Sequence, residues 1–291
     1  MTWKFVPESP VRSPGKINWL GAALMSVGLA SVLLAVSQGA DWGWLAGKTL
    51  ALFLFGLVVL AAWVRAELGA QDPLVDMRMM RIKGVWTTNL VAFLLGVGLY
   101  ASFILVPQLV QLPESTGFGF GASVTQAGVY LLPSAFAMLI FGAMAGKLEA
   151  LYGSKPPLMV GILAAAASFL LLALAHGSDV DIYLSSLLLG IGIGLAFAAM
   201  ANLIVQSVRQ DQTGVATGMN TVMRSLGGAV GAQAVAAILV SSLAGGLPAE
   251  STFTLSFWVC TGALLVAVGV STLIPGRERP AQAPSLMPAR A

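Results

Sequence analysis

Residues 78–114, RMMRIKGVWTTNLVAFLLGVGLYASFILVPQLVQLPE, contain the pattern that decides the fold. Three cationic side chains, Arg78, Arg81 and Lys83, precede an apolar run over about 85–108, and Glu114 follows it. A helix of about 20 apolar residues is long enough to cross roughly 30 Å of hydrocarbon. The stretch therefore predicts a membrane-spanning helix with one basic end and one acidic end.

Seven similar apolar runs lie on either side of this stretch. The eight predicted spans cover about 18–37, 47–65, 85–108, 124–146, 157–176, 181–206, 213–243 and 252–274. They are expected to be helices, because lipid offers no partner for backbone groups outside helices and closed barrels, and the runs are too long for barrel strands. With 57% hydrophobic and 9% charged residues, we expect an all-α membrane protein without a soluble domain.

Basic residues fall almost entirely into alternate gaps between these spans. The odd-numbered polar segments hold Lys4, Arg12, Lys16; Arg65, Arg78, Arg81, Lys83; Lys147, Lys155; Arg209, Arg224; and Arg277, Arg279, Arg290. The one exception is Lys48, and the even-numbered gaps carry mainly acidic residues. Because Lys and Arg in short loops concentrate on the cytoplasmic side, both termini are expected inside an inner or plasma membrane. The same placement explains the net charge of +3 without a nucleic-acid partner.

The chain divides at a polar connection into two helices followed by six. We expect a cytoplasmic segment at 1–17, two leading helices at 18–65, a linker at 66–84, a six-helix bundle at 85–275 and a disordered tail at 276–291. The six helices permit an interpretation as three plus three, since inverted three-helix repeats are common in secondary transporters.

Polar residues inside apolar spans are the best candidates for a functional site, because each costs free energy in lipid unless it faces protein or water. In the seventh span, Asn220, Arg224, Gly227 and Gly231 lie within about a quarter of the helix circumference. Arg224 either lines or gates a cavity or anchors the cytoplasmic end of its helix. The small-xxx-small spacing of Gly227 and Gly231 predicts close helix packing.

Two other spans contribute candidates. Asn89 and Tyr100 in the third span lie near one face with aromatic neighbours, which suits a cavity for flat, apolar or cationic molecules. Asn202 and Gln206 in the sixth span are one turn apart and form a secondary pair. Pro133 is expected to kink the fourth span.

Several kinds of chemistry have no support in the sequence. We find no carboxylate well inside a span, no metal-ligand cluster and no cofactor or nucleophile–base motif. Cys260 has no second cysteine to pair with and is interpreted as a small core residue. An enzyme, a metal site and a cofactor are therefore not expected, which leaves a transporter, a channel or a membrane scaffold.

Five stretches resemble a known transporter family. TWKFVPES at 2–9 and GKINWLGAALMSVGLASVLLAVSQGADWGW at 15–44 are similar to the region after the sixth helix of the fourteen-helix drug:proton antiporter branch of the major facilitator superfamily. DPLVDMRMMRIKG at 72–84 resembles the connection into the second half of that branch. AGVYLLPSAFAMLIFGAMAGKLEALYGSK at 127–155 and TGVATGMNTVMRSLGGAVG at 213–231 resemble helices of that second half.

The resemblance also includes a cytoplasmic loop motif. Gly146, Leu148 and Gly153, with Lys155 just after them, match it, whereas Ala150 and Leu151 stand where an Asp and an Arg are usual. The resemblance implies two insert helices plus a C-terminal half, without the first six helices and the proton-coupling residues that they carry.

This resemblance implies the C-terminal portion of a proton-coupled multidrug efflux antiporter, with small amphipathic or cationic substrates. Alternating access needs two bundles around one central site, so the chain alone is expected to be inactive. A separate N-terminal six-helix half would complete it. Two alternatives stay open: a homo-oligomeric transporter built from two copies, and a non-transporting membrane scaffold.

Overall fold

The computed structural model describes residues 18–70, 73, 75–244 and 246–275. The predicted N-terminal segment 1–17 and the predicted tail 276–291 lie outside the described residues. Eight of the described helices are long and apolar enough to cross a membrane, which confirms the prediction of an all-α membrane protein with eight spans. The elements are α2 (Trp19–Trp42), α3 (Gly47–Gly69), α4 (Met77–Met80), α5 (Lys83–Gln111), η1 (Glu114–Thr116), α6 (Val124–Tyr152), α7 (Lys155–Leu174), α8 (Asp179–Ser207), η2 (Gln210–Gln212), α9 (Thr213–Ser241), β1 (Leu243–Ala244), β2 (Leu247–Pro248) and α10 (Glu250–Thr272).

The helices begin and end at local signals in the sequence. Ser123 and Ser178 each form a capping box at the first turn of α6 and α8, which satisfies backbone N–H groups that have no partner within the helix. Gly153 ends α6 with a φ of +82°, a conformation that L side chains rarely adopt. Hydropathy placed the ends of α3 and α6 at 65 and 146, whereas the helices continue to Gly69 and Tyr152. Helical hydrogen bonding thus extends beyond the apolar run.

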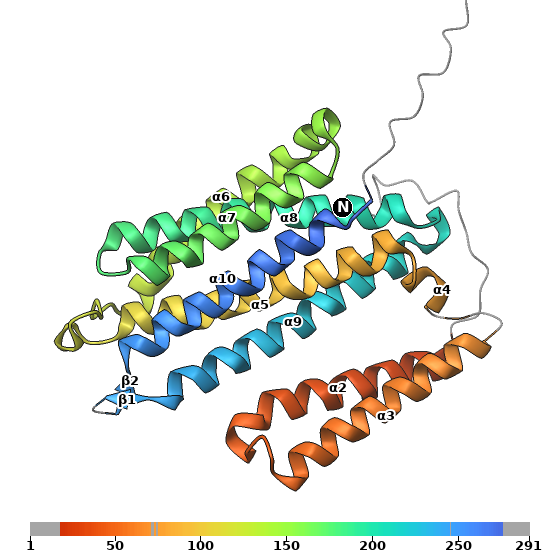
Figure 1. The fold of residues 1–291 in the computed structure, drawn as a ribbon, viewed down its shortest axis with the longest axis horizontal. Helices are drawn as coiled ribbons and strands as arrows, with labels where there is room; N and C mark the ends of the chain where they lie inside the picture. The colour runs from red at the N-terminus through yellow and green to blue at the C-terminus, as the bar shows by residue number, and fades with distance from the viewer. Residues whose placement is uncertain (1–17, 71–72, 74, 245, 276–291) are drawn as a thin grey trace, which may run out of the picture.

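The six helices after the linker form one bundle (Figure 1). The most extensive contacts are α5 with α9, α6 with α8, α7 with α8, α10 with α7, and α10 with α5. The first three helices, α5, α6 and α7, can be matched in order with the last three, α8, α9 and α10. The α5–α9 contact then corresponds to the α8–α6 contact, and the α7–α8 contact corresponds to the α10–α5 contact. The pairing therefore has the pattern expected of two three-helix repeats.

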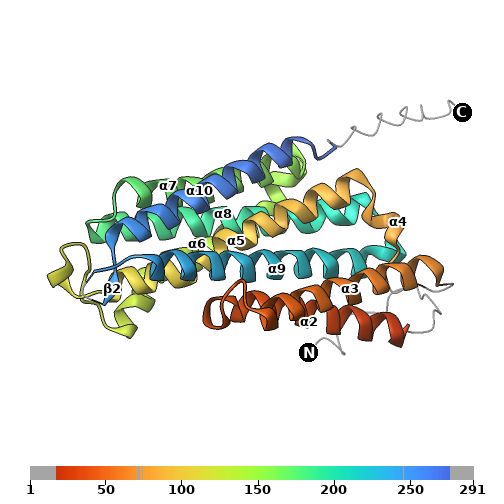
Figure 2. The same ribbon diagram turned by 60° about the horizontal axis from the view of Figure 1, so that its bottom comes forward.

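The first two spans form a separate hairpin on one side of this bundle. In Figure 2, α2 and α3 lie along α9, and α2 contacts α9 directly. A second apolar cluster joins the hairpin to the bundle through Trp63 of α3, Met79 of α4, Ile204 of α8 and Met219 of α9. The described part of the connection between the second and third spans, Val75 to Met80, is thus packed against the bundle.

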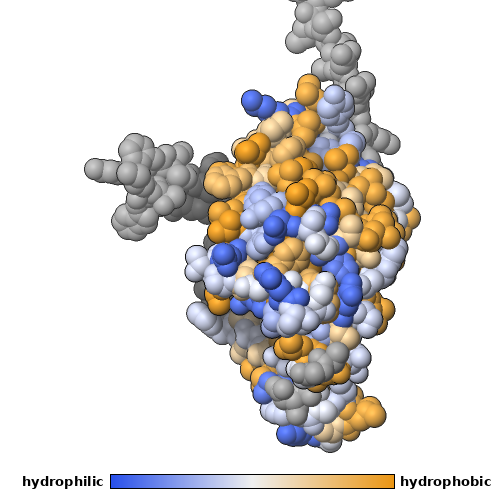
Figure 3. Space-filling view, turned by 90° about the vertical axis from the view of Figure 1, so that its left-hand side faces the viewer, coloured by the Kyte–Doolittle hydropathy of each residue, from blue (hydrophilic) through white to orange (hydrophobic). Residues whose placement is uncertain are grey.

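The two ends of the bundle differ in charge. The basic end comprises the α3–α5 connection and the α6–α7 and α8–α9 turns, and the acidic end comprises the other connections between spans. Figure 3 shows the acidic end, where hydrophilic side chains gather over the centre and hydrophobic ones over much of the surrounding flank. An apolar flank with polar ends is the surface expected of a protein embedded in a bilayer.

Candidate functional site

Two of the predicted cavity residues are hydrogen-bonded to each other between α5 and α9. Nδ2 of Asn220 donates to Oδ1 of Asn89 at 3.0 Å and lies 3.4 Å from the carbonyl oxygen of Thr88. Both asparagine side chains are buried. The structure therefore brings Asn89 and Asn220 together, and their pairing satisfies polar groups that would be costly to leave alone in an apolar interior.

Small residues bring the backbones of α5 and α9 into close contact just beyond this amide pair. A Cβ at Gly227 would collide with the carbonyl oxygen of Phe93, and one at Gly231 would lie 2.6 Å from the backbone of Val97. On the facing helix, a Cβ at Gly96 would collide with the carbonyl oxygen of Arg224. Gly227 and Gly231 thus lie where the two helices are closest.

Arg224 points from α9 toward α8. The Cζ atom of its guanidinium lies 4.4 Å from the centroid of the Phe197 ring, within the range of a cation–π interaction. The Arg224 side chain is half-buried. The aromatic face of Phe197 stabilises the arginine in this position.

Tyr100 lies on α5 next to the same part of α9. Its ring packs against Gly228, and it meets Phe103 edge-to-face with ring centroids 6.3 Å apart. With 40% of its surface exposed, Tyr100 is the most accessible of the four primary candidates. The four primary candidates therefore lie along the contact between α5 and α9. Asn89 and Asn220 form a buried amide pair, and the side chains of Arg224 and Tyr100 are partly accessible.

The two secondary candidates gather elsewhere, around a carboxylate at the basic end. Nδ2 of Asn202 donates to Oε2 of Glu149, and Oγ of Ser154 donates to the same oxygen at 3.0 Å. Nε2 of Gln206 donates to Oγ of Ser154 at 3.2 Å. Asn202 and Gln206 thus join α8 to the end of α6 and the α6–α7 turn, and they do not hydrogen-bond to Asn89 or Asn220.

Two buried carboxylates were not predicted from the sequence, because the predicted spans ended before them. Glu149 in α6 is 8% exposed and Glu67 in α3 is 2% exposed. Glu67 accepts from Nδ2 of Asn18 and from the backbone N–H of Val75, both at 3.2 Å, so it ties the linker to the start of α2. The signal that could have found them was an isolated acidic residue within two helical turns of an apolar run.

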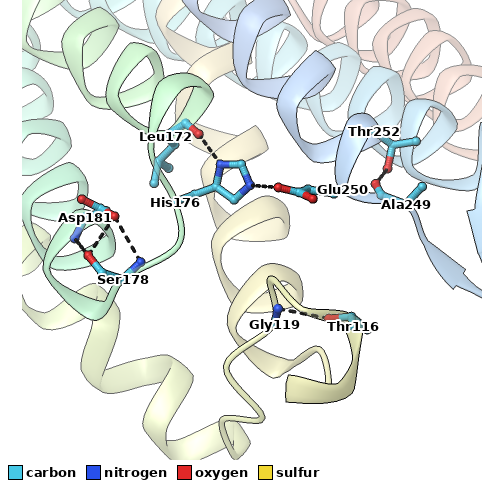
Figure 4. Close-up of polar contacts among 9 residues, drawn as sticks. All are labelled: Thr116, Gly119, Leu172, His176, Ser178, Asp181, Ala249, Glu250 and Thr252. Carbon is cyan, nitrogen blue, oxygen red and sulfur yellow. Dashed lines mark hydrogen bonds and ion pairs between the residues drawn. The ribbon is translucent and has the colours of Figure 1, made fainter.

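The acidic end has its own polar contacts, shown in Figure 4. Nε2 of His176 lies 3.2 Å from Oε1 of Glu250, and Nδ1 of the same ring lies 2.8 Å from the carbonyl oxygen of Leu172. Ser178 and Asp181 form the capping box of α8 beside it. His176 therefore connects the end of α7 to the start of α10.

Pro133 lies within α6, and α6 stays helical through it. The adjacent Ser134 contacts α8 closely, since a Cβ at Gly190 would collide with the Ser134 carbonyl oxygen. Among the described residues, no group of three or more His, Cys, Asp or Glu side chains could hold a metal ion. The site consists of amides, aromatic rings and one arginine.

Comparison with known proteins gives the family. Residues 15–232 match the Major Facilitator Superfamily, and this chain belongs to that superfamily. The multidrug transporter protein MdtP of Bacillus subtilis (strain 168) is 28% identical over 230 residues, which are 77% of this chain and 41% of the relative. A tetracycline resistance determinant of Streptomyces rimosus is 29% identical over 216 residues, which are 73% of this chain and 60% of the relative.

A solved structure supports the fold independently. The crystal structure of the nucleoside transporter NupG superposes with a TM-score of 0.59 at 14% sequence identity, covering 88% of this chain and 83% of that chain. At this identity the likeness shows the fold alone. The chain spans 41% and 60% of the two curated relatives, so each relative contains a substantial region that this chain does not match.

Proposed function

We propose that this chain is the C-terminal portion of a proton-coupled multidrug efflux antiporter of the plasma membrane, with both termini in the cytoplasm. In this proposal, α2 and α3 are the two insert helices of the fourteen-helix branch, and α5–α10 form the second six-helix half. The observation that carries it is a family match over residues 15–232, combined with an α2–α3 hairpin that lies outside a six-helix bundle.

The α5–α9 contact is proposed as one wall of the substrate cavity. Tyr100 and the Phe197 ring under Arg224 offer aromatic surface to flat or amphipathic molecules, and aromatic faces also attract organic cations. Asn89 and Asn220 hold the wall together and keep its amides close to the cavity. Arg224, half-buried and directed toward α8, is proposed to line the cavity rather than anchor a helix end.

Transport by this chain is proposed to need a second bundle. Alternating access moves two bundles around a site between them, and this chain supplies one six-helix bundle. A separate N-terminal six-helix half is the proposed partner. A second copy of this chain is the other arrangement that provides two bundles.

Dye efflux from everted membrane vesicles tests the proposal. The chain alone should give no efflux, whereas co-expression with the six-helix N-terminal half of a fourteen-helix relative should give efflux that a protonophore abolishes. Arg224→Gln should lower this efflux, and the exposed Arg209→Gln should not. If the chain alone gives efflux and native mass spectrometry shows that it is a dimer, the second bundle is a second copy of this chain and not a separate N-terminal half. Efflux by the monomeric chain would refute the need for two bundles.

A further inference from the structure

A cavity of about 830 Å³ lies at the basic end of the bundle, outside the α5–α9 contact. It is bounded by the end of α6, the α6–α7 turn, the start of α7 and the last turns of α8. Ligand pockets for small organic molecules typically measure roughly 300–1,000 Å³ and are mostly apolar. Much of this lining is apolar, with Leu151, Met159, Val160, Leu163 and Leu203 among its residues.

Glu149 lines the same cavity and has an unused acceptor. Its Oε2 atom accepts from Ser154 and Asn202, but its Oε1 atom is buried without a hydrogen-bond partner. Within the described part of the chain, Glu149 forms no ion pair with a Lys, Arg or His side chain. A buried carboxylate without a cationic partner is costly, so a ligand that brings a positive charge to Oε1 is favoured.

The cationic side chain that lines the cavity is already engaged. Lys155 lines the cavity, but its Nζ donates to the carbonyl oxygens of Thr272 at 2.6 Å and Ile274 at 2.8 Å. The first bond satisfies the carbonyl of the last residue of α10, which has no partner within the helix, and the second satisfies a carbonyl just beyond the helix end. Lys147 on α6 is exposed. Among the residues that the structure describes, the cavity thus contains one carboxylate, Glu149, that no Lys, Arg or His side chain pairs with.

The apolar side of the cavity reaches the flank of the bundle. Val160 and Leu163 both line the cavity and are exposed. In a bilayer, exposed leucine and valine side chains on a helix flank face the acyl chains. A ligand dissolved in the membrane could therefore reach the cavity without crossing the bundle.

We propose that this cavity binds a lipophilic organic cation, with its positive centre near Oε1 of Glu149 and its apolar body against Met159, Val160 and Leu163. The site is separate from the proposed substrate wall at Asn89, Tyr100, Asn220 and Arg224. Its role in delivering substrates depends on the proposed multidrug transport, but the binding itself needs only this chain.

The test measures binding of radiolabelled tetraphenylphosphonium to the full chain in nanodiscs, with empty nanodiscs as background. Glu149→Gln keeps the shape and the amide contacts of the site but removes the charge, so the affinity should fall by about tenfold or more. Tetraphenylborate, which has nearly the same shape and the opposite charge, should not lose affinity in this variant. Glu67→Gln is the matched control, because it neutralises the other buried carboxylate away from the cavity.

Each result decides the proposal. The proposal is overturned if Glu149→Gln binds tetraphenylphosphonium as tightly as the unchanged chain does, or if Glu67→Gln loses as much affinity as Glu149→Gln.

If Glu149→Gln does not fold, Val160→Trp is used instead, because the tryptophan fills the cavity from an exposed position. Unchanged binding in that variant also overturns the proposal. If binding depends on Glu149 but co-expression with the N-terminal half gives no efflux, the proposed binding site is supported and only the proposed function is contradicted.

Discussion

Replacing Gly231 with alanine is expected to destabilise the bundle by separating α5 from α9. The new Cβ would lie 2.6 Å from the Cα and carbonyl oxygen of Val97, whereas ordinary contacts begin at 3.4 Å. The two backbones must move apart locally by about 0.8 Å, the difference between these distances. Backbone shifts of this kind in a packed interior cost about 1–3 kcal/mol.

A matched variant on the same helix separates this cost from the effect of alanine on helix formation. Gly218→Ala also replaces a glycine of α9, but its Cβ would meet nothing within 4 Å. Both variants gain about 1 kcal/mol of helix propensity, so the difference between them isolates the helix contact.

The assay is unfolding by sodium dodecyl sulfate titrated into dodecyl maltoside micelles, followed by circular dichroism. We expect the free energy of unfolding of Gly231→Ala to be about 1–3 kcal/mol below that of Gly218→Ala. Equal stability of the two variants would show that α5 and α9 are not in close contact at Gly231, and the proposed cavity wall would lose its framework.

Three further substitutions test individual contacts. Asn220→Leu removes the hydrogen bond to Asn89 and should lower the free energy of unfolding in the same titration by about 1 kcal/mol; no change would show that the amide pair is not formed. Arg224→Lys should reduce efflux in the two-bundle assay, because a lysine ammonium is more strongly hydrated than guanidinium and stacks less well on Phe197; full efflux would contradict a role in the wall. Lys155→Met frees the carbonyls of Thr272 and Ile274 at the end of α10 and should speed amide exchange in the final turn of the helix; unchanged exchange would show that another contact holds this end.

The sequence was sufficient to predict the spans because hydropathy reports directly on transfer into lipid. All eight predicted spans correspond to helices of the structure. Their ends could not be predicted as well, since a helix continues until its hydrogen bonding is interrupted. In α6, that interruption is the positive φ of Gly153, so Glu149 belongs to the helix although it lies beyond the apolar run.

The grouping of polar residues was only partly accessible from the sequence. Helical periodicity placed Asn220 and Arg224 near one face of their span, but the partner of Asn220 is 131 positions away on α5. Asn202 and Gln206 were recognised as a pair, yet their partners Glu149 and Ser154 come from the preceding helix pair. Contacts between helices depend on which faces meet, and no pattern within one span contains that information.

In the proposed topology, the eight helices cross the membrane with the basic end in the cytoplasm. Single cysteines introduced at Lys83 and Leu151 on the basic end, and at Glu114 and Glu250 on the acidic end, can be labelled in whole cells after Cys260 is replaced with alanine. A membrane-impermeant maleimide should label the cysteines at 114 and 250 in intact cells, and those at 83 and 151 only after the cells are opened. Labelling of the cysteine at 83 or 151 in intact cells would contradict the account.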